Sequence, residues 1–482
     1  MFNLEFNLEF IVNNLKRYVY NTTIYTLYGL YNVLNIGRLS LNIGLFVLYK
    51  KFSGRYNDYL LNNIIYNINN CGYITIKFTQ WITSRLLLIK NTPENIRVLK
   101  KMEDIYENCS THTLNETNML YEMDFSKDIN DDYKILSLLG SGSIGQVYKA
   151  RDLRTDELVA IKVKHYGIEY KYLVSYYLIK YVLFLFWLFP HLNYRLFPMD
   201  LSGFINQLNC QLDFTKEAEN GKRMHNNFEN NPLVVIPKVV KHSENIIIME
   251  YVEGEQLNNI NLSDFKMRQI ALYFTLLIYE MAFIHRFLHG DLHKGNWKVQ
   301  YDEKTNDFKI VYYDFGYIWE LNNIDKTKLF LESIRYNLSE NISKIIFENS
   351  IKLSNTDSSI ESINNIILKY VDPTTPLTTQ LFMDLAFKLA SKYKIIYNTD
   401  LINVMVMLVQ IEELCVKNKI SQQIPMHYTN SLEFQRDLNN EYIILCNMYK
   451  YHGELKEYFD FLNNKHSIKR DVLNSISYLD GL

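Results

Sequence analysis

Cysteine is scarce in this chain, and its distribution bears on both compartment and metal content. The 482 residues include five cysteines, which are odd in number, scattered and never paired as C-x-x-C: Cys71, Cys109, Cys210, Cys415 and Cys446. This pattern is typical of a chain in a reducing, intracellular compartment, and it supplies no ligand set for structural zinc.

A long apolar run is also missing. The most apolar stretch, 172–190, is interrupted by Lys180 and ended by Pro190, which leaves nine unbroken residues at 181–189. A membrane-spanning helix needs about 20 apolar residues, so the stretch predicts buried or membrane-facing helices rather than a span. The N-terminus carries Glu5 and Glu9 and lacks a basic start and cleavage site, so no targeting segment is indicated. A lipid or membrane surface stays open as a partner, and no organelle is indicated.

An excess of positive charge is absent as well. The formal net charge is −2, and basic pairs such as Lys50-Lys51 and Lys100-Lys101 are isolated. Nucleic acid is therefore not an expected partner. Because 48% of the residues are hydrophobic, the chain can bury one large core or two linked cores.

The chain does contain four short motifs in a fixed order: GSGSIGQV at 140–147, VAIK at 159–162, HGDLHKGN at 289–296 and DFG at 314–316. They match the signature set of the protein-kinase fold, which is a Gly-rich loop, a lysine, a catalytic loop and a metal-binding aspartate. The gaps leave room for the strands that this fold places between them. Each motif alone would be weak, but the joint occurrence predicts a site for Mg-ATP.

Each motif supplies a group that phosphate chemistry needs. Glycines let the chain run close over phosphates, and a lysine gives the α- and β-phosphates a point charge. Asparagine and aspartate oxygens suit Mg²⁺, and a catalytic-loop aspartate can accept the proton of an attacking hydroxyl. The residues expected to bind nucleotide are Gly140, Ser141, Gly142, Ser143, Gly145, Val147 and Lys162, with Glu250 and Val252 at a hinge behind the adenine. Asn296 and Asp314 are the expected metal ligands, and Asp291, Lys162 and Asn296 belong to the expected catalytic group.

A lone G-x-G-x-x-G could instead be a dinucleotide fingerprint, which requires a helix directly after the loop. Here the loop runs into QVYKARD, a turn at 154–157 and then LVAIKVK. This pattern predicts strand, loop and strand, so the dinucleotide interpretation fails.

Further motifs make the chain resemble the UbiB family, the aarF-domain-containing, atypical kinase-like proteins. They are GYITIKFTQWITSR (72–85), GSIGQVYKA (142–150), QLDFTKEAEN (211–220) and HGDLHKGN. The resemblance runs from about Gly72 to beyond Gly316. It implies that Glu217 is the helix carboxylate that pairs with Lys162, where a solvated surface acid is the alternative. His289 is expected to brace its loop rather than to react.

The chain departs from the family's pattern at several positions. Gly140-Ser141-Gly142 replaces an Ala-rich loop, and Gln211 replaces the first acid of an E-x-D pair. Thr79 replaces glycine in K-x-G-Q, and Lys294 replaces proline in the catalytic loop. The Gly-rich loop and the lost carboxylate suggest nucleotide handling closer to that of ordinary kinases.

The resemblance also implies a regulatory role for Lys77, Gln80 and Asp213. Lys77 and Gln80 lie three residues apart, so both can point from one helix face. A surface pair is the ordinary interpretation. The family implies instead that their helix lies across the active cleft, near Asp213, Asp291 and Asp314. No A-P-E follows Gly316, so no long segment is available to dock a peptide.

These observations predict an α+β, bilobal protein-kinase-like fold with an N-terminal helical extension packed over the cleft. The expected parts are the extension at 1–115, an N-lobe with inserted helices at 116–253, and a helical C-lobe with C-terminal helices at 254–482. The favoured function is a UbiB-like atypical kinase or ATPase that binds Mg-ATP, in a family associated with isoprenoid-quinone and other lipid metabolism. A conventional Ser/Thr protein kinase and a non-catalytic nucleotide-binding scaffold are the alternatives. The sequence names neither the phosphoryl acceptor nor the oligomeric state.

Overall fold

The structure is a computed structural model, and it describes the chain in stretches. Without a gap it describes residues 2–73, 111–169, 198–229, 233–263, 285–292, 295–305, 307–320, 339–353, 359–370 and 379–402, and scattered residues between these ranges and up to Met405. The chain divides into two compact units. The first comprises Met1–Asp156 and Ile161–Leu188, and the second comprises Glu157–Ala160 and Phe189–Leu482.

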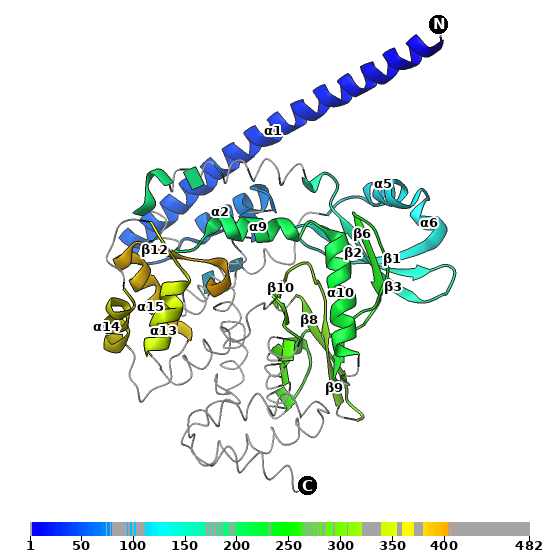
Figure 1. Ribbon diagram of the computed structural model, residues 1–482. Coiled ribbons are helices and arrows are strands. Elements are labelled where there is room, and N and C mark those ends of the chain that lie inside the picture. The colour runs from blue at the N-terminus through cyan, green and yellow to red at the C-terminus, as the bar shows by residue number, and fades with distance from the viewer. Residues whose placement is uncertain are drawn as a thin grey trace. The chain divides into compact units, whose positions relative to one another are not determined.

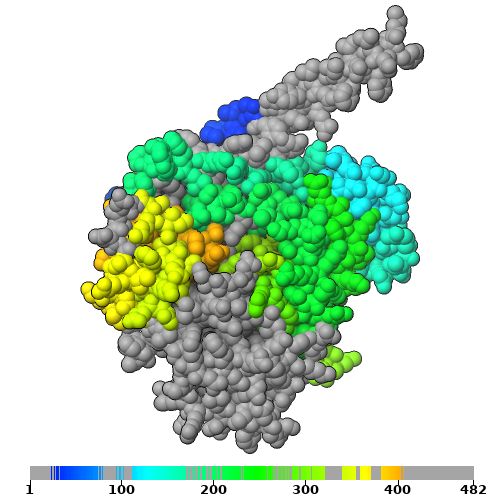
Figure 2. Space-filling view, in the orientation of Figure 1, coloured from blue at the N-terminus to red at the C-terminus, as the bar shows by residue number. Residues whose placement is uncertain are grey.

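The first unit begins with helices and continues into a β-hairpin. Its elements are α1 (Phe2–Ser53), α2 (Asp58–Asn70), α5 (Leu114–Phe125), α6 (Ile129–Asp132), β1 (Tyr133–Ser141) and β2 (Gly145–Asp152). The next strand, β3 (Leu158–Lys164), starts in the second unit and ends in the first. The long helix α1 is prominent in Figure 1, and α5 and β1 form part of the cyan surface in Figure 2.

The two N-terminal helices pack through an aliphatic seam. Leu39 and Phe46 of α1 contact the buried Ile64 and Ile68 of α2, and Ile76 completes this cluster. None of the helices in the described part of the chain is both long and apolar enough to cross a bilayer.

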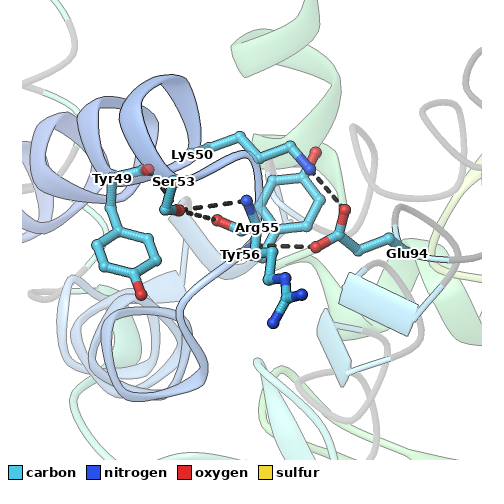
Figure 3. Close-up of polar contacts among 6 residues, drawn as sticks. All are labelled: Tyr49, Lys50, Ser53, Arg55, Tyr56 and Glu94. Atoms are coloured by element: carbon cyan, nitrogen blue, oxygen red, sulfur yellow. Dashed lines mark hydrogen bonds and ion pairs between the residues drawn. The ribbon is translucent and has the colours of Figure 1, made fainter.

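Polar groups secure the end of α1 (Figure 3). The Ser53 hydroxyl donates to the carbonyl of Tyr49 over 2.7 Å, as a free carbonyl at a helix end requires. The Glu94 carboxylate accepts a hydrogen bond from the Tyr56 N–H at 2.9 Å and pairs with the ammonium of Lys50. The hydrogen bond from Lys50 holds the pKa of Glu94 below its usual value. The Lys50–Glu94 pair thus joins the last turn of α1 to a residue outside that helix.

The Gly-rich motif lies in the turn between β1 and β2. These strands pair antiparallel from Tyr133 with Asp152 to Ser141 with Gln146. The next element is the strand β3, so the predicted strand–loop–strand arrangement is confirmed and no helix follows the loop as a dinucleotide fingerprint requires.

The second unit combines small sheets with helices. Its elements are α9 (Leu201–Cys210), α10 (Phe214–Phe228), β4 (Val234–Val235), β5 (Val239–His242), β6 (Ile246–Glu250), η1 (Leu257–Asn259), β7 (Phe287–His289), β8 (Trp297–Asp302), β9 (Asp307–Tyr312), β10 (Ile318–Glu320), α13 (Ser339–Glu348), β11 (Ser350–Lys352), α14 (Ile360–Tyr370), α15 (Thr379–Tyr393) and β12 (Ile395–Tyr397). The catalytic loop and DFG are thus joined by β8 and β9, the two short strands that their spacing predicts.

Within the described residues, the strands of the chain form four sheets. The largest has the order β1-β2-β3-β6-β5, and the others are β4-β9-β8, β10-β7 and β11-β12. In the second unit α10 packs along β5 and β6. Phe308, Ile310 and Tyr312 occupy alternate buried positions of β9, and the Tyr312 ring lies 6.4 Å from the His289 ring of the catalytic loop. The α+β class is therefore as predicted, whereas the packing of the N-terminal helices over a cleft stays a prediction.

Candidate functional site

Asp314 of the DFG motif has an unusual backbone. Its φ is 58°, in the left-handed region that non-glycine residues rarely enter, and its side chain is exposed. Its Oδ1 accepts a hydrogen bond from the Gly316 N–H at 3.2 Å, which helps to hold this geometry. A left-handed residue costs about 1–2 kcal/mol. Such strain is often kept at a functional site, because the surrounding structure must hold it in place.

Helix α10 packs directly on the DFG motif. The Asn220 amide donates to the Phe315 carbonyl over 2.9 Å, and a methyl group placed at Gly221 would lie 3.3 Å from the Phe315 ring. A methyl group at Gly316 would lie 3.3 Å from Glu217 Oε2. The buried Glu217 carboxylate therefore lies beside the turn that carries Asp314, all within the second unit.

Asp213 lies at the start of helix α10. It is the N-cap of α10, and its Oδ1 accepts a hydrogen bond from the Lys216 N–H at 3.0 Å. An aspartate cap satisfies one of the first N–H groups of a helix and complements its dipole. It therefore fixes the start of the helix that carries Glu217.

The catalytic loop is braced from inside. His289 is 1% exposed, and its Nε2 donates to the Tyr313 carbonyl over 3.0 Å while its Nδ1 accepts from the Asp291 N–H over 3.2 Å. The Asn296 amide nitrogen donates to the Asp291 carbonyl at 2.8 Å, and the Asn296 carbonyl accepts from the Tyr313 N–H at 2.8 Å. Because the Asn296 nitrogen makes this bond, its side-chain oxygen remains as an acceptor suited to a cation.

Gly290 is required by a close approach. A methyl group there would lie 2.6 Å from the Tyr317 ring, and the Gly290 N–H donates to the Tyr317 carbonyl at 2.9 Å. The catalytic loop and the residue after DFG are therefore locked together by their main chains, as β7 and β10 are beside them.

The predicted hinge follows β6. The Tyr313 hydroxyl donates to the Val252 carbonyl over 2.9 Å, and burial raises the pKa of Tyr313, which keeps this donor protonated. The exposed Glu250 donates a hydrogen bond from its main-chain N–H to the Lys238 carbonyl over 2.9 Å. These contacts hold the end of β6 and the residues after it, which are predicted to lie behind the adenine.

The phosphate loop belongs to the first unit. The Gly142 N–H donates to the Gly145 carbonyl over 2.9 Å and closes the tip. A methyl group at Gly145 would lie 2.4 Å from the Val163 carbonyl oxygen, whereas one at Gly140 would meet nothing within 4 Å. The buried Ser141 and the half-buried Ser143 and Val147 complete the predicted set.

Lys162 and Lys77 also lie in the first unit. Lys162 is on β3 and is 9% exposed, and Lys77 is half-buried in a helical segment. Gln80 lies outside the described residues, as do His293 and Lys294 of the catalytic loop. The pairing of Lys162 with Glu217 and the reach of Lys77 towards Asp213, Asp291 and Asp314 would join the two units, and both stay predictions.

Sequence reasoning missed a polar cluster behind the phosphate loop, formed by His112, Thr117, Gln146, Tyr148 and His165. One signal was present. On β2 the inward positions include Gln146, and a polar residue at a buried strand position needs hydrogen-bond partners. His112 is 34 residues earlier, so nothing local could identify it as that partner.

The chain is similar to several known proteins. The ABC1 atypical kinase-like domain matches residues 101–347, just over half of the chain. A probable serine/threonine-protein kinase, abkC, of Dictyostelium discoideum is 26% identical over 255 residues, 52% of this chain and 36% of the relative. The probable protein kinase UbiB of Cronobacter sakazakii is 31% identical over 217 residues, 41% of this chain and 37% of the relative.

AarF domain-containing protein kinase 1 of Xenopus tropicalis is 28% identical over 188 residues, 37% of this chain and 34% of the relative. In each of these cases the match spans little more than a third of the relative's own length. A solved structure of a Mycobacterium tuberculosis protein in complex with erythromycin aligns with 65% of this chain and 84% of that chain, at 15% identity and a TM-score of 0.42.

Proposed function

The chain belongs to the ABC1 atypical kinase-like family, and from that premise we propose that it binds Mg-ATP and catalyses phosphoryl transfer or ATP hydrolysis. The observation that carries the proposal is the left-handed backbone of Asp314, which presents an exposed carboxylate at the cost of strain. The contacts of α10 with Phe315 and Gly316 hold this turn from behind.

The donor set suits magnesium. Asp314 offers a carboxylate, and Asn296 offers an amide oxygen because its nitrogen is bonded to the Asp291 carbonyl. Mg²⁺ binds through one or two such oxygens together with phosphate oxygens and water. When bound, it would neutralise charge on the transferring phosphoryl group.

The remaining residues take roles that follow from their chemistry. Gly140, Ser141, Gly142, Ser143, Gly145 and Val147 would cover the phosphates, and Glu250 and Val252 would border the adenine. Lys162 would contact the phosphates and would be held by Glu217, and Asp291 would orient the acceptor hydroxyl. The Tyr313 hydroxyl donates to the Val252 carbonyl and would hold this segment in place beside the adenine.

We assign the acceptor to the small-molecule or lipid class, in line with the family's link to isoprenoid-quinone metabolism. The sequence has no A-P-E after Gly316, and its K-x-x-Q helix would crowd a peptide. A conventional Ser/Thr protein kinase is the second candidate, because Gly140-Ser141-Gly142 is closer to an ordinary kinase loop and a Dictyostelium discoideum relative is named a probable serine/threonine-protein kinase.

The test is metal-dependent binding. Mg-ATP at 100 times its Kd should stabilise the parent protein by about 2.7 kcal/mol, visible as a rise in Tm. In Asp314→Asn this rise should disappear, because a neutral amide is a far poorer Mg²⁺ ligand. Asp307→Asn, at the exposed start of β9 in the same unit, is the matched control and should respond as the parent does. An Asp314→Asn protein that still shifts with Mg-ATP would overturn the metal assignment.

A second assay separates the candidate reactions. ATP turnover by the parent is measured alone, with lipid vesicles and with a generic Ser/Thr peptide. Turnover that rises with lipid supports the proposed class, and phosphate on the peptide would favour the protein kinase. Binding without any turnover would leave a scaffold and would contradict the proposed catalysis.

A further inference from the structure

A chain of hydrogen bonds runs from the tip of the phosphate loop to helix α5. We call it the histidine relay, and it consists of His165, His112, Thr117 and Tyr148. His165 Nδ1 lies 2.8 Å from His112 Nδ1, and His112 Nε2 lies 2.9 Å from the Thr117 hydroxyl. That hydroxyl lies 2.9 Å from the Tyr148 hydroxyl. Thr117 and Tyr148 are buried, so water does not compete for these groups.

His165 holds the loop at two points. Its Nε2 lies 2.9 Å from the Gly142 carbonyl, and its main-chain N–H donates to the Ile144 carbonyl over 2.8 Å. The loop tip, residues 142–145, is therefore attached to the residue that directly follows β3. The carbonyl of Gly142 can only accept, so His165 Nε2 must carry a proton.

The pairing of the two rings sets a further condition. Two Nδ1 atoms at 2.8 Å can share one proton, so one ring must present a bare nitrogen to the other. If His165 is neutral, its proton is on Nε2 and His112 is the donor. Thr117 can then donate to His112 Nε2, and Tyr148 to Thr117. A doubly protonated pair would place two N–H groups against each other and break the contact.

Gln146 binds the main chain of His112, the second residue of the relay. Its Oε1 accepts from the His112 N–H at 3.0 Å, and its Nε2 donates to the His112 carbonyl at 3.0 Å. The same amide nitrogen also donates to the Tyr148 hydroxyl. Gln146, the second residue of β2, thus binds the main chain of His112, just before the capping box that Thr113 and Glu116 make for α5.

We propose that His165 and His112 are positioning residues of the phosphate loop, which hold it in the binding geometry only while the ring pair is not doubly protonated. This inference rests on the proposed nucleotide site, since a fixed loop matters because its main chain must meet the phosphates. It adds a pH-sensitive control of nucleotide affinity to that site. The loss occurs as the pH falls and the second ring of the pair takes up a proton.

Other ionisable groups lie on the elements next to the pair in the chain. Glu116 lies on α5, Tyr148 on β2 and Lys164 at the end of β3, where it pairs with Glu169 over 3.1 Å. In the second unit His289 also accepts at Nδ1, from the Asp291 N–H, so its protonation would disturb the catalytic loop. A pH profile of the parent protein alone therefore does not distinguish protonation of the His165–His112 pair from protonation of His289. The test needs a non-titrating substitute at position 165.

Two variants of His165 make that separation. Glutamine can donate to the Gly142 carbonyl and accept from His112 without titrating, whereas phenylalanine can do neither. Affinity for a fluorescent ATP analogue with Mg²⁺ is measured at about pH 7.5 and about pH 5.5. Hydrogen exchange of the amides of residues 140–147 is measured at about pH 7.5 without nucleotide. His191→Gln, at an exposed histidine of the second unit, is the matched control.

His165→Phe should weaken binding about 10-fold at the higher pH, as expected for loss of about 1.4 kcal/mol of hydrogen bonding, and should speed exchange in the loop. His165→Gln should match the parent at the higher pH and lose less affinity than the parent at the lower pH. Thr117→Val removes the hydroxyl that contacts His112 and keeps the side-chain shape. It should weaken nucleotide binding and speed loop exchange in the same direction as His165→Phe, but by less. It serves as the second variant if His165→Phe fails to fold.

Unchanged loop exchange in both His165→Phe and Thr117→Val would overturn the positioning role. A His165→Gln protein that loses as much affinity at low pH as the parent would overturn the control by this ring pair. If the parent binds no nucleotide at either pH, the proposed function fails, while the exchange measurement still decides whether the relay holds the loop.

Discussion

Two motif-bearing loops of this chain are held by different kinds of contact. In the second unit the catalytic loop and DFG are joined mainly through main-chain groups, such as the Gly290 N–H on the Tyr317 carbonyl and the Tyr313 N–H on the Asn296 carbonyl. In the first unit the phosphate loop is tied to its surroundings by the side chain of His165 and the relay behind it. Main-chain contacts do not titrate, and imidazole contacts do. The catalytic loop therefore has main-chain bonds to the segment after DFG in addition to the His289 ring, whereas the carbonyl of Gly142 in the phosphate loop is held by the His165 side chain.

The two loops also store strain differently. Asp314 carries its strain in its own φ of 58°, whereas Gly145 avoids strain by having no side chain against β3. A side chain added at Gly145 should therefore lower the stability of the protein through a steric contact. A substitution of Asp314 should instead change nucleotide binding. Three substitutions test this contrast.

The largest effect is expected for Gly145→Ala. The new methyl group would lie 2.4 Å from the Val163 carbonyl oxygen, a main-chain atom that cannot step aside, and overpacking of this kind costs about 1–3 kcal/mol. Gly140→Ala in the same loop meets nothing within 4 Å and should change stability by less than about 0.5 kcal/mol. Urea unfolding of both variants is the measurement. Equal losses would show that the loop is strained as a whole and not at one contact.

An intermediate effect is expected for Lys162→Met. The lysine is predicted to hold phosphates, and a hydrogen bond to a charged group is worth about 1.5–3 kcal/mol, so nucleotide affinity should fall about 10- to 150-fold. Lys164→Met is the control on the same strand, since Lys164 is also buried and pairs with Glu169. Titration with a fluorescent nucleotide compares them. If both variants lose affinity alike, β3 as a whole is responsible and Lys162 has no special role.

The smallest effect on stability is expected when strain is released by Asp314→Gly. Glycine enters the left-handed region freely, but it also loses more entropy on folding, so stability should change by less than about 1 kcal/mol. Asp156→Gly is matched, because Asp156 has a φ of 60° in the turn before β3. Thermal unfolding should treat the two variants alike, while Mg-dependent nucleotide binding should be lost in the first only. Loss of binding in both would mean that the strain, rather than the carboxylate, is what binding needs.

Much of the fold around the motifs could be predicted from sequence. The alternation in QVYKARD and LVAIKVK predicts β2 and β3, and the gap between Asp291 and Asp314 predicts β8 and β9, because both signals are local in the chain. The family assignment from GSIGQVYKA and HGDLHKGN is confirmed by the match over residues 101–347. Lys77 and Gln80 remain predictions, since their proposed targets lie in the other unit and Gln80 lies outside the described residues.

By itself, the sequence determined which chemical groups this protein carries and in what order, because motif spacing is a property of the chain. Only the tertiary structure decided how those groups are held. Phe315, which follows the left-handed Asp314, accepts a hydrogen bond at its carbonyl from Asn220 of α10, 95 residues earlier in the chain. The histidine relay depends on His112 meeting His165 from outside the motif. Both are contacts between residues far apart in sequence, and such contacts arise from the packing of whole elements, which no local pattern encodes.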